Sequence, residues 1–365
     1  MLGKETRLTW ARSSRLSKFF KNMVEALKDE DLSMASDGTA AAEFGGFIDT
    51  GSYVLNAVFS ADLFGGIPDN KAIAFAGETS TGKTFFILGI VKSFLDANPE
   101  GGVLYYDTES AVTKKMMLGR GIDIDRVIIG EPSTVQEFRF KAITFLDKYI
   151  ETPVNERPKL MMALDSLGML STSKEMEDTA EGKETKDMTR AGIIRAAFRV
   201  LRLKLARAKV PILVTNHTYA AIGSMYPTQE ISGGGGLKFS ADQIAMLSKR
   251  KEKVGDEVIG NVIHVKMWKS RLSRENKQVD VLLTYSGGLD RYYGLLDLAE
   301  RYGVFKKVST RYELPDGSKQ FGKTIYDDPE RFFTKEVLDQ INEGVKAEYS
   351  YGTPEDTSRQ EVEAL

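Results

Sequence analysis

The chain has 365 residues, of which 42% are hydrophobic and 28% are charged, a composition typical of a soluble globular protein with one large core and smaller appendages. It has no cysteine and two histidines, which excludes disulfides, thiolate zinc sites, cysteine nucleophiles and a histidine-based metal site, and fits a reducing cytoplasm. The formal net charge is −2, so any nucleic-acid binding must come from local patches. No apolar run has the length of a membrane span and no signal peptide is recognisable, so we expect a cytoplasmic protein without a membrane partner.

The first predicted element is an amphipathic helix over residues 14–28. Its apolar side chains share one helical face, and they are Leu16, Phe19, Phe20, Met23, Val24 and Leu27. A segment rich in Asp, Ser, Ala and Gly follows and is typical of a linker, so residues 1–46 form a separate N-terminal region. The helix can pack on its own core or dock on a neighbouring subunit.

The predicted core domain covers residues 47–300 and alternates apolar strands with helices. We expect strands at 72–76, 103–106, 160–164 and 211–215, and helices at 85–95, 134–150 and 190–208. The helix at 134 begins with a capping box, in which Thr134 and Glu137 satisfy each other's backbone N–H groups. The pattern predicts an α/β fold with a mostly parallel sheet covered by helices on both faces. Functional groups in such a sheet lie beyond the carboxyl ends of the strands.

Two further strands, at 258–267 and 279–285, are expected to be neighbours. Residues 301–346 form a smaller C-terminal region with a helix beginning at Thr334. Residues 347–365 are predicted to be a polar, disordered tail, above all from about Gly352 onward.

The most specific motif is the run from Gly77 to Thr84, GETSTGKT, which matches G-x-x-x-x-G-K-[ST] at every fixed position. The predicted ATP-binding residues are Gly77, Glu78, Thr79, Ser80, Thr81, Gly82, Lys83 and Thr84. Backbone N–H groups of such a loop and the start of the next helix bind phosphate oxygens. Lys83 then reaches the β- and γ-phosphates, and the Thr84 hydroxyl ligates Mg²⁺.

Two carboxylates follow strands of the same sheet. Asp165 ends the strand at 160–164 and is expected to hold the water shell of Mg²⁺. Glu109 lies just beyond the strand at 103–106, where it can orient or deprotonate the attacking water; the sequence alone equally allows a solvated loop glutamate.

The order of motifs resembles the RecA family, and it is similar above all to the UvsX-type recombinases of T-even-type phages. The motifs are GETSTGKT, YYDTES (105–110), LMMALDSLG (160–168), VTNH (214–217) and GGGGLKFSAD (233–242), supported by DMTRA (187–191), KSR (269–271) and GGLDRYYGLLDLAERYG (287–303). The resemblance runs from about residue 45 to 325. It implies a RecA-type P-loop NTPase core.

The resemblance also implies individual roles. Glu109 would activate water, and His217 would sense the γ-phosphate and signal to a DNA-binding loop. From the residue alone, a lone His at a strand end is more often a structural hydrogen-bonding group. Lys269 and Arg271 would project into the ATP site of the adjacent subunit, and Phe239 would pack into that neighbour. If the N-terminal helix docks on a neighbouring subunit, Phe19 and Phe20 also lie at the subunit interface. Met116 occupies the position where family members stack an aromatic ring on the adenine.

Two segments, 171–189 and 218–236, match the family's flexible DNA-binding loops, although neither is basic. Because affinity for phosphates needs cations, the candidate DNA-binding residues flank these loops: Arg190, Arg195, Arg199 and Lys238, with the backbone of Gly233, Gly234, Gly235 and Gly236. A solvated helix face is the alternative for the arginines.

The resemblance implies an ATP- and Mg²⁺-dependent DNA recombinase that forms helical filaments on single-stranded DNA and pairs it with homologous double-stranded DNA. A single-strand-binding protein and a loading mediator would be its partners, in the cytoplasm of a phage-infected host. The alternatives are a hexameric helicase with the same fold and a recombination mediator that hydrolyses ATP poorly.

Overall fold

The computed structural model describes residues 18–27, 32, 34–37, 43–183, 187–220, 229–232 and 235–351. The chain divides into two compact units, Met1–Phe44 and Gly45–Leu365. In the first unit, residues 18–27 are helical and a short 3₁₀ helix covers Ala35–Asp37. The ends of the predicted helix at 14–17 and 28 lie outside the described residues.

One large sheet organises the second unit, with strand order β12-β11-β10-β9-β3-β7-β6-β4-β5 and β8 paired to β7. Its strands are β3 (Ala72–Gly77), β4 (Gly102–Asp107), β5 (Val127–Gly130), β6 (Leu160–Asp165), β7 (Ile212–Ala220), β8 (Gln229–Ile231), β9 (Gln243–Val254), β10 (Glu257–Lys269), β11 (Gln278–Thr284) and β12 (Gly288–Leu289). From β5 to β9 the neighbours are parallel, and β9 to β12 are antiparallel. The predicted mostly parallel sheet is confirmed, as is the pairing of the two later strands.

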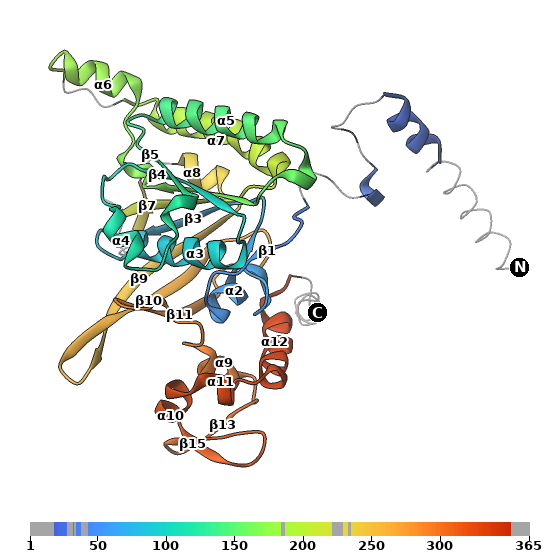
Figure 1. The fold of residues 1–365 in the computed structure, drawn as a ribbon, viewed down its shortest axis with the longest axis vertical. Helices are drawn as coiled ribbons and strands as arrows, with labels where there is room; N and C mark the ends of the chain where they lie inside the picture. The colour runs from blue at the N-terminus through green and yellow to red at the C-terminus, as the bar shows by residue number, and fades with distance from the viewer. Residues whose placement is uncertain are drawn as a thin grey trace, which may run out of the picture. The chain divides into compact units, whose positions relative to one another are not determined.

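Helices cover both faces of the sheet (Figure 1). One face carries α2 (Tyr53–Ser60) and α3 (Lys83–Ala97), and the other carries α5 (Val135–Glu151), α7 (Arg190–Ala208) and α8 (Gly235–Ser240). Residues of β4 alternate between the two cores, with Val103 and Tyr105 on the α3 side and Leu104 and Tyr106 on the α5 side. This alternation explains why the strands are apolar throughout, because both faces of each strand are buried.

Short elements connect these layers: β1 (Phe47–Ile48), β2 (Ile67–Pro68), α4 (Lys114–Leu118), α6 (Ser173–Ala180) and the 3₁₀ turns Ile124–Arg126, Val154–Glu156 and Leu167–Met169. The predicted capping box of α5 is only half right. Thr134 accepts from the N–H of Glu137, but the Glu137 carboxylate accepts from the N–H of Ser133. A complete capping box lies instead at Thr172 and Glu175, where it begins α6.

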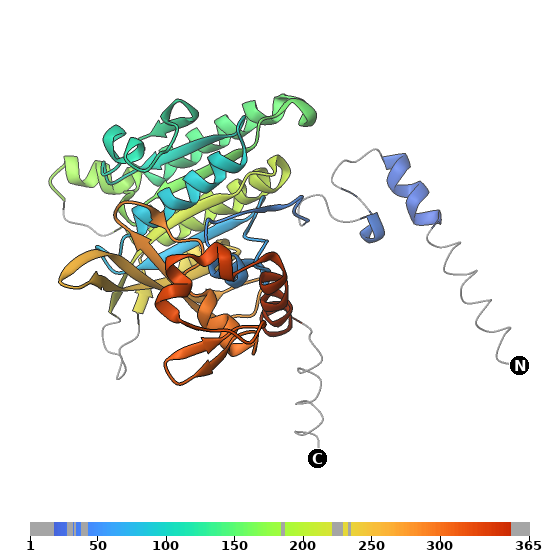
Figure 2. The ribbon, with the colours of Figure 1, turned by 60° about the horizontal axis from the view of Figure 1, so that its bottom comes forward.

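The predicted flexible segment 171–189 is therefore partly helical. Residues 184–186 of that segment, and residues 221–228 and 233–234 of the second, lie outside the described residues. The long antiparallel pair β9–β10 extends beyond the helical layers (Figure 2). Within the described part of the chain, no helix is long and apolar enough to cross a membrane.

The C-terminal part of this unit follows β12. It contains α9 (Leu295–Arg301), a small antiparallel sheet, and the helices α10 (Gly322–Asp327), α11 (Pro329–Phe332) and α12 (Lys335–Tyr349). The small sheet consists of β13 (Lys306–Val308), β14 (Arg311–Glu313) and β15 (Lys319–Phe321). Thr334 caps α12 as predicted, by accepting from the N–H of Val337. The proposed boundary at residue 300 falls inside α9, and the predicted tail beyond Tyr351 lies outside the described residues.

Candidate nucleotide-binding site

The sheet register brings the sequence motifs together at one edge. Gly77, at the end of β3, pairs with His217 of β7, and Asp107, at the end of β4, pairs with Asp165 of β6. Because these strands are parallel neighbours, their carboxyl ends open onto the same place. The motifs therefore meet although more than a hundred residues separate Gly77 from His217.

Two glycines allow the loop from Gly77 to Thr84 to form. A Cβ at Gly77 would lie 2.6 Å from the carbonyl oxygen of Leu247, so a side chain cannot fit there. Gly82 has φ of 91°, a left-handed conformation that favours glycine. The Nζ of Lys249, on the neighbouring strand β9, donates to the carbonyl of Ser80 and stabilises the loop conformation.

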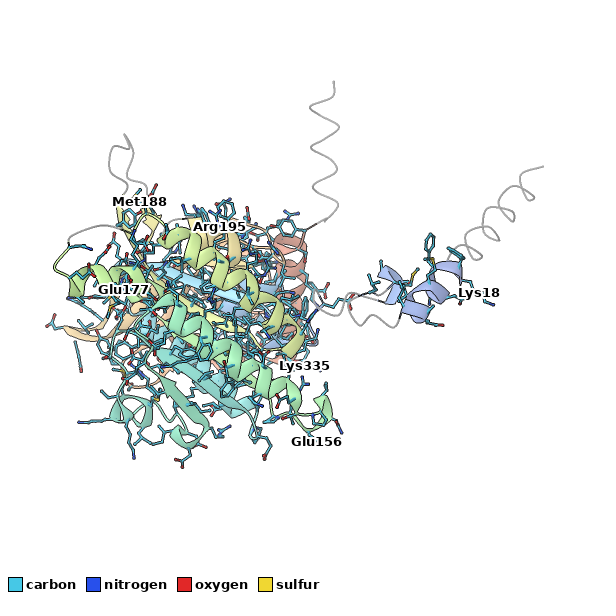
Figure 3. The ribbon with its side chains drawn as sticks, turned by 90° about the horizontal axis from the view of Figure 1, so that it is seen from above. Lys18, Glu156, Glu177, Met188, Arg195 and Lys335 are labelled. Carbon is cyan, nitrogen blue, oxygen red and sulfur yellow. The ribbon has the colours of Figure 1, made fainter. Side chains whose placement is uncertain are left out.

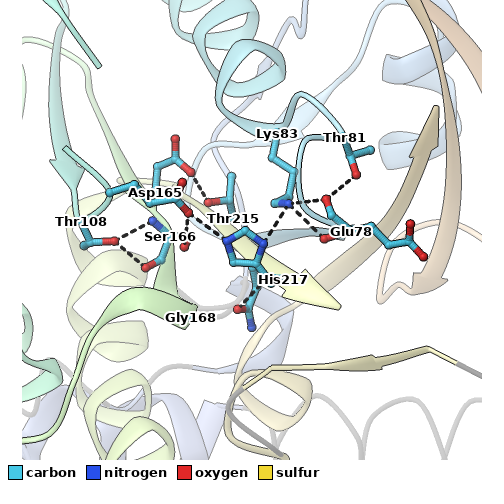
Figure 4. Close-up of polar contacts among 12 residues, drawn as sticks. Glu78, Thr81, Lys83, Thr108, Asp165, Ser166, Gly168, Thr215 and His217 are labelled. Carbon is cyan, nitrogen blue, oxygen red and sulfur yellow. Dashed lines mark hydrogen bonds and ion pairs between the residues drawn. The ribbon is translucent and has the colours of Figure 1, made fainter. Parts of the chain in front are cut away.

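Lys83 is buried at the start of α3, and its ammonium faces back across the loop. Its Nζ donates to the carbonyls of Gly77 at 3.0 Å and Glu78 at 2.8 Å, and lies 3.4 Å from Nδ1 of His217 (Figure 4). Burial lowers the pKa of Lys83, although Glu109 and Asp165 favour its charged form. The ammonium is therefore held among three polar groups of the loop and of β7.

Glu109 is positioned by a chain of short contacts. The buried carboxylate of Asp107 accepts from the backbone N–H groups of Glu109 at 3.1 Å and Val112 at 2.9 Å, which fixes the turn after β4. Ser166 Oγ donates to Oε1 of Glu109 at 2.8 Å, and Nε2 of His217 lies 2.9 Å from the same oxygen. Burial raises the pKa of Glu109, but the contacts with Ser166 and His217 outweigh burial and the pKa lies below its ordinary value. Glu109 is thus an ionised, oriented carboxylate and not a free loop residue.

Asp165 is almost completely buried, and neighbouring strands hold both of its oxygens. Tyr105 donates its hydroxyl to Oδ2 at 2.8 Å, and Thr215 donates to Oδ1. A carboxylate oxygen can accept more than one hydrogen bond, so Asp165 can also accept from the water shell of a cation. Among the described residues, no group of three or more His, Asp or Glu side chains can hold a metal ion by itself. A Mg²⁺ ion here would take ligands from phosphate oxygens and from Thr84, a donor set that fits.

A cavity of ≈390 Å³ joins these groups. It is lined by Thr79, Ser80, Gly82, Lys83, Thr84, Phe85, Glu109, Ala111, Met116, Asp165 and His217. The structure therefore places the loop, both predicted carboxylates, His217 and Met116 around one space. Sequence reasoning missed the supporting residues Asp107, Tyr105, Ser166 and Thr215, because their role depends on strand pairing that no local motif reveals.

Lys269 and Arg271 do not line this cavity. The Lys269 ammonium donates to the carbonyls of Lys238 and Ala241, both at 2.7 Å, at the end of α8. Arg271 lies 3.3 Å from the Asp242 carboxylate. Burial and the neighbouring Arg271 lower the pKa of Lys269. Within one chain, Lys269 and Arg271 therefore bind groups outside the P-loop (residues 77–84).

The predicted DNA-binding residues are in different environments. Arg195 and Arg199 are exposed on α7, which lies beside α5 (Figure 3), and the Arg195 guanidinium lies 4.9 Å above the ring of Phe239. Lys238 lies 5.3 Å over the Trp268 ring. Arg190, in contrast, donates to the carbonyl of Gly168 at 2.8 Å.

The glycine run at 233–236 is only partly described. Gly233 and Gly234 lie outside the described residues, and Gly235 begins α8. A Cβ on Gly236 would lie 2.8 Å from Ile194, so this glycine lets α8 pack closely on α7.

Comparisons with known proteins cover most of this chain. The family model described as the RecA N-terminal domain matches residues 33–290. The "Recombination and repair protein" of Enterobacteria phage T4 is 30% identical over 254 residues, which cover 70% of this chain and 63% of the phage protein. "Protein RecA" of Brucella anthropi is 26% identical over 321 residues (85% of this chain, 84% of that protein), and "Protein RecA" of Streptomyces venezuelae is 25% identical over 323 residues (86% and 80%).

Proposed function

The chain belongs to the RecA family, and we propose on this basis that it is an ATP-dependent DNA recombinase. It would assemble as a helical filament on single-stranded DNA and catalyse homologous pairing and strand exchange with double-stranded DNA. The observation that carries the proposal is the convergence of Lys83, Asp165, Glu109 and His217 on one cavity of a RecA-family chain. The names of the phage and bacterial relatives, a recombination and repair protein and RecA, support the same activity.

ATP is the proposed substrate, with Mg²⁺ as cofactor. The backbone of residues 77–84 would hold the β- and γ-phosphates, and Lys83 would exchange its contacts with the loop carbonyls for phosphate oxygens. Thr84 and Asp165 would hold Mg²⁺ directly and through water, and the cation would neutralise charge on the phosphates. Met116 would cover the adenine with its thioether, a softer contact than an aromatic ring.

Glu109 would orient and deprotonate the attacking water. Its carboxylate is ionised and held by Ser166, which leaves its second oxygen to accept a proton. His217 touches both Glu109 and Lys83, so it would respond to a phosphate bound between them. The backbone carbonyl of His217, the residue just before the predicted second DNA-binding loop, accepts from the N–H of Ser232, near the far end of that loop, at 2.8 Å. This bond would carry the response toward DNA.

DNA would bind beside α7 and α8. Arg195, Arg199 and Lys238 are the cations we assign to phosphates, and the predicted loops at 171–189 and 218–236 flank them. Phe239, 65% exposed, and the helix at 18–27, with Phe19 57% and Phe20 51% exposed, present apolar groups to a neighbouring subunit. A single-strand-binding protein and a loading mediator remain the proposed protein partners.

Electron microscopy with single-stranded DNA, ATP and Mg²⁺ tests the assembly, and a strand-exchange assay with homologous and heterologous duplexes tests the activity. We expect helical filaments and exchange with the homologous duplex only. Lys83→Ala should keep the wild-type circular dichroism spectrum but lose hydrolysis. Closed rings would favour a hexameric helicase. The absence of both filaments and hydrolysis would favour a mediator. Phe19→Ala/Phe20→Ala should shorten the filaments while the monomer melts normally.

A further inference from the structure

A second cavity, of ≈250 Å³, lies along α3 on the side of Phe85. We name it the α3 cavity. Its walls come from Gly51, from the face of α3 that carries Phe85, Leu88, Gly89, Lys92, Ser93 and Asp96, from Arg120, and from Gly287, Gly288, Leu289 and Arg291. A buried water needs only ~10–15 Å³ of such space, so the α3 cavity has room for a small ligand. Phe85 belongs to both cavities, so the α3 cavity is the immediate neighbour of the nucleotide-binding site.

The charges that line the α3 cavity are mostly positive. Lys92, Arg120 and Arg291 face one acid, Asp96. Lys92 is paired with Asp96 at 2.5 Å, and Arg291 is paired with Asp49 at 2.9 Å. These two pairs leave Arg120 as the cation of the cavity without an acidic partner among the described residues.

The Phe85 ring contacts the Arg120 guanidinium, but it accepts no hydrogen bond from the Arg120 Nε. Its guanidinium carbon lies 4.2 Å above the centre of the Phe85 ring. Stacking uses the face of a guanidinium and leaves its N–H edge to donate. The Nε of Arg120 is buried and has no hydrogen-bond partner in the part of the chain that the structure describes. Burial lowers the pKa of Arg120, which means that the protein has desolvated this cation without supplying a counter-charge.

Ser93 adds an uncharged donor on the same wall. It lies one turn of α3 away from Gly89. β12 packs closely on that glycine, since a Cβ there would lie 3.0 Å from Leu289. The structure records no hydrogen bond for the Ser93 hydroxyl within the described residues. A planar guanidinium, an ammonium and a hydroxyl are the side-chain groups that bind phosphate oxygens.

We propose that the α3 cavity is a second phosphate-binding site, which takes a phosphate group of a small ligand and is separate from the P-loop. Arg120 donates from its N–H edge, Ser93 donates its hydroxyl, and Lys92 supplies charge from the shared pair with Asp96. Leu88, Leu289 and the Phe85 ring exclude water around the contact and so strengthen it. Binding of the ligand supplies the acceptor that Arg120 lacks within the chain.

Inorganic pyrophosphate is the probe, with binding measured by isothermal titration calorimetry on the full chain. The background is Lys83→Ala, because this change weakens phosphate binding at the P-loop and leaves the α3 cavity untouched. We expect Lys83→Ala to bind pyrophosphate, and Lys83→Ala/Arg120→Met to bind it roughly tenfold to hundredfold more weakly, the loss typical of one charged hydrogen bond. Arg139→Met in the same background removes an arginine of α5 that does not line the cavity, and it should change nothing.

Ser93→Ala in the Lys83→Ala background is the second variant. It changes a partly exposed hydroxyl and leaves the stacking of Arg120 intact, so it should fold and weaken pyrophosphate binding several-fold. Malonate, a dicarboxylate, separates phosphate recognition from general anion binding and should bind far more weakly than pyrophosphate. The proposal is overturned if Arg120→Met and Arg139→Met, both in the Lys83→Ala background, bind pyrophosphate equally tightly. It is also overturned if malonate binds as tightly as pyrophosphate. Neither result bears on strand exchange, which is measured separately on the wild-type chain.

Discussion

Nε2 of His217 lies 2.9 Å from Oε1 of Glu109, the same oxygen that accepts from Ser166. The contact joins β7 to the turn after β4, across the intervening strand β6. Two groups therefore hold one carboxylate oxygen, and the orientation of Glu109 depends on the position of β7. A shift of His217 toward a bound phosphate would break one of these two contacts, and would so couple the state of the nucleotide to Glu109, the proposed water-activating group.

Glu109→Gln should separate ATP binding from chemistry. Glutamine keeps the size and can still contact Ser166 and His217, but it cannot take a proton. We expect the rate of phosphate release to fall about 10²- to 10⁴-fold, the usual contribution of a general base, while ATP affinity stays near the wild-type value. Single-turnover hydrolysis and equilibrium nucleotide binding measure the two quantities. The control is Glu131→Gln, which changes an exposed glutamate outside the cavity; normal turnover in Glu109→Gln would assign water activation elsewhere.

Ser166→Ala should change the pH dependence of hydrolysis. The pKa of Glu109 lies below its ordinary value because the Ser166 and His217 contacts outweigh burial. A depressed pKa keeps the carboxylate ionised as the pH falls, so activity persists into acid until the pH passes that folded-state pKa. Removing the Ser166 hydroxyl raises the pKa of Glu109, and the acid limb of the kcat/KM profile should move to higher pH. An acid limb in the same place would mean that it reports another group.

Local motifs predicted most of the residues that line the candidate nucleotide-binding cavity, and they did so for physical reasons. Gly77 and Gly82 are required by a close approach and by a positive φ, and Lys83 and Thr84 follow them at fixed spacing. Because the strands were recognisable as apolar runs, the end of each strand also located Asp165 and Glu109. His217 needed the family resemblance, since a lone histidine at a strand end has no local signature.

The supports of the site could not be predicted in the same way. Tyr105 reaches Asp165 from β4, and Lys249 reaches the P-loop from β9. These contacts depend on the sheet order, which places β9 beside β3 although more than 160 residues separate them. The helix α6 was missed because its capping box, at Thr172 and Glu175, begins a charged segment without an apolar face, and propensity alone is a weak signal there.

Arg190 and the pair Arg195/Arg199 should behave differently when they are removed. Arg190 donates to the Gly168 carbonyl and lies 3.7 Å from the Glu175 carboxylate, so it ties α7 to the turn after β6 and to α6. Arg190→Met should cost about 1–3 kcal/mol of folding stability, measured by urea unfolding, because it leaves two partly buried partners unpaired. We expect the salt dependence of DNA binding to stay near the wild-type value in this variant.

Arg195→Ala/Arg199→Ala is the matched comparison on the same helix. Both side chains are exposed, so stability should change little. Each phosphate contact contributes about 0.7 to the slope of log affinity against log salt for single strands, and losing two contacts should flatten the slope by roughly 1.4. Fluorescence anisotropy with a labelled oligonucleotide between low and moderate salt measures the slope. A flattened slope in Arg190→Met and an unchanged one in the double variant would reverse the two assignments.

The last prediction is that a second subunit completes the ATP site through Lys269 and Arg271. Both cations are absent from the cavity of their own chain, and their present partners are two carbonyls at the end of α8 and the Asp242 carboxylate. A cation supplied across a subunit boundary stabilises charge on the γ-phosphate, and losing it costs on the order of a thousandfold in rate. Lys269→Ala/Arg271→Ala should therefore be nearly inactive although its P-loop is intact.

Complementation distinguishes action across the boundary from action within one chain. Lys83→Ala subunits carry a good basic pair and a defective P-loop, and Lys269→Ala/Arg271→Ala subunits carry the reverse. If each subunit type fills half of the positions in a mixed filament, roughly one quarter of the head-to-tail interfaces join a good P-loop to a good pair. ATPase activity should then rise to about that fraction of the wild-type rate, although each variant alone is almost inactive. If the pair acted within its own chain, no subunit in the mixture would hold both halves of a site. Co-assembly, verified by energy transfer between differently labelled variants, would then bring no recovery, and that result would exclude the shared site.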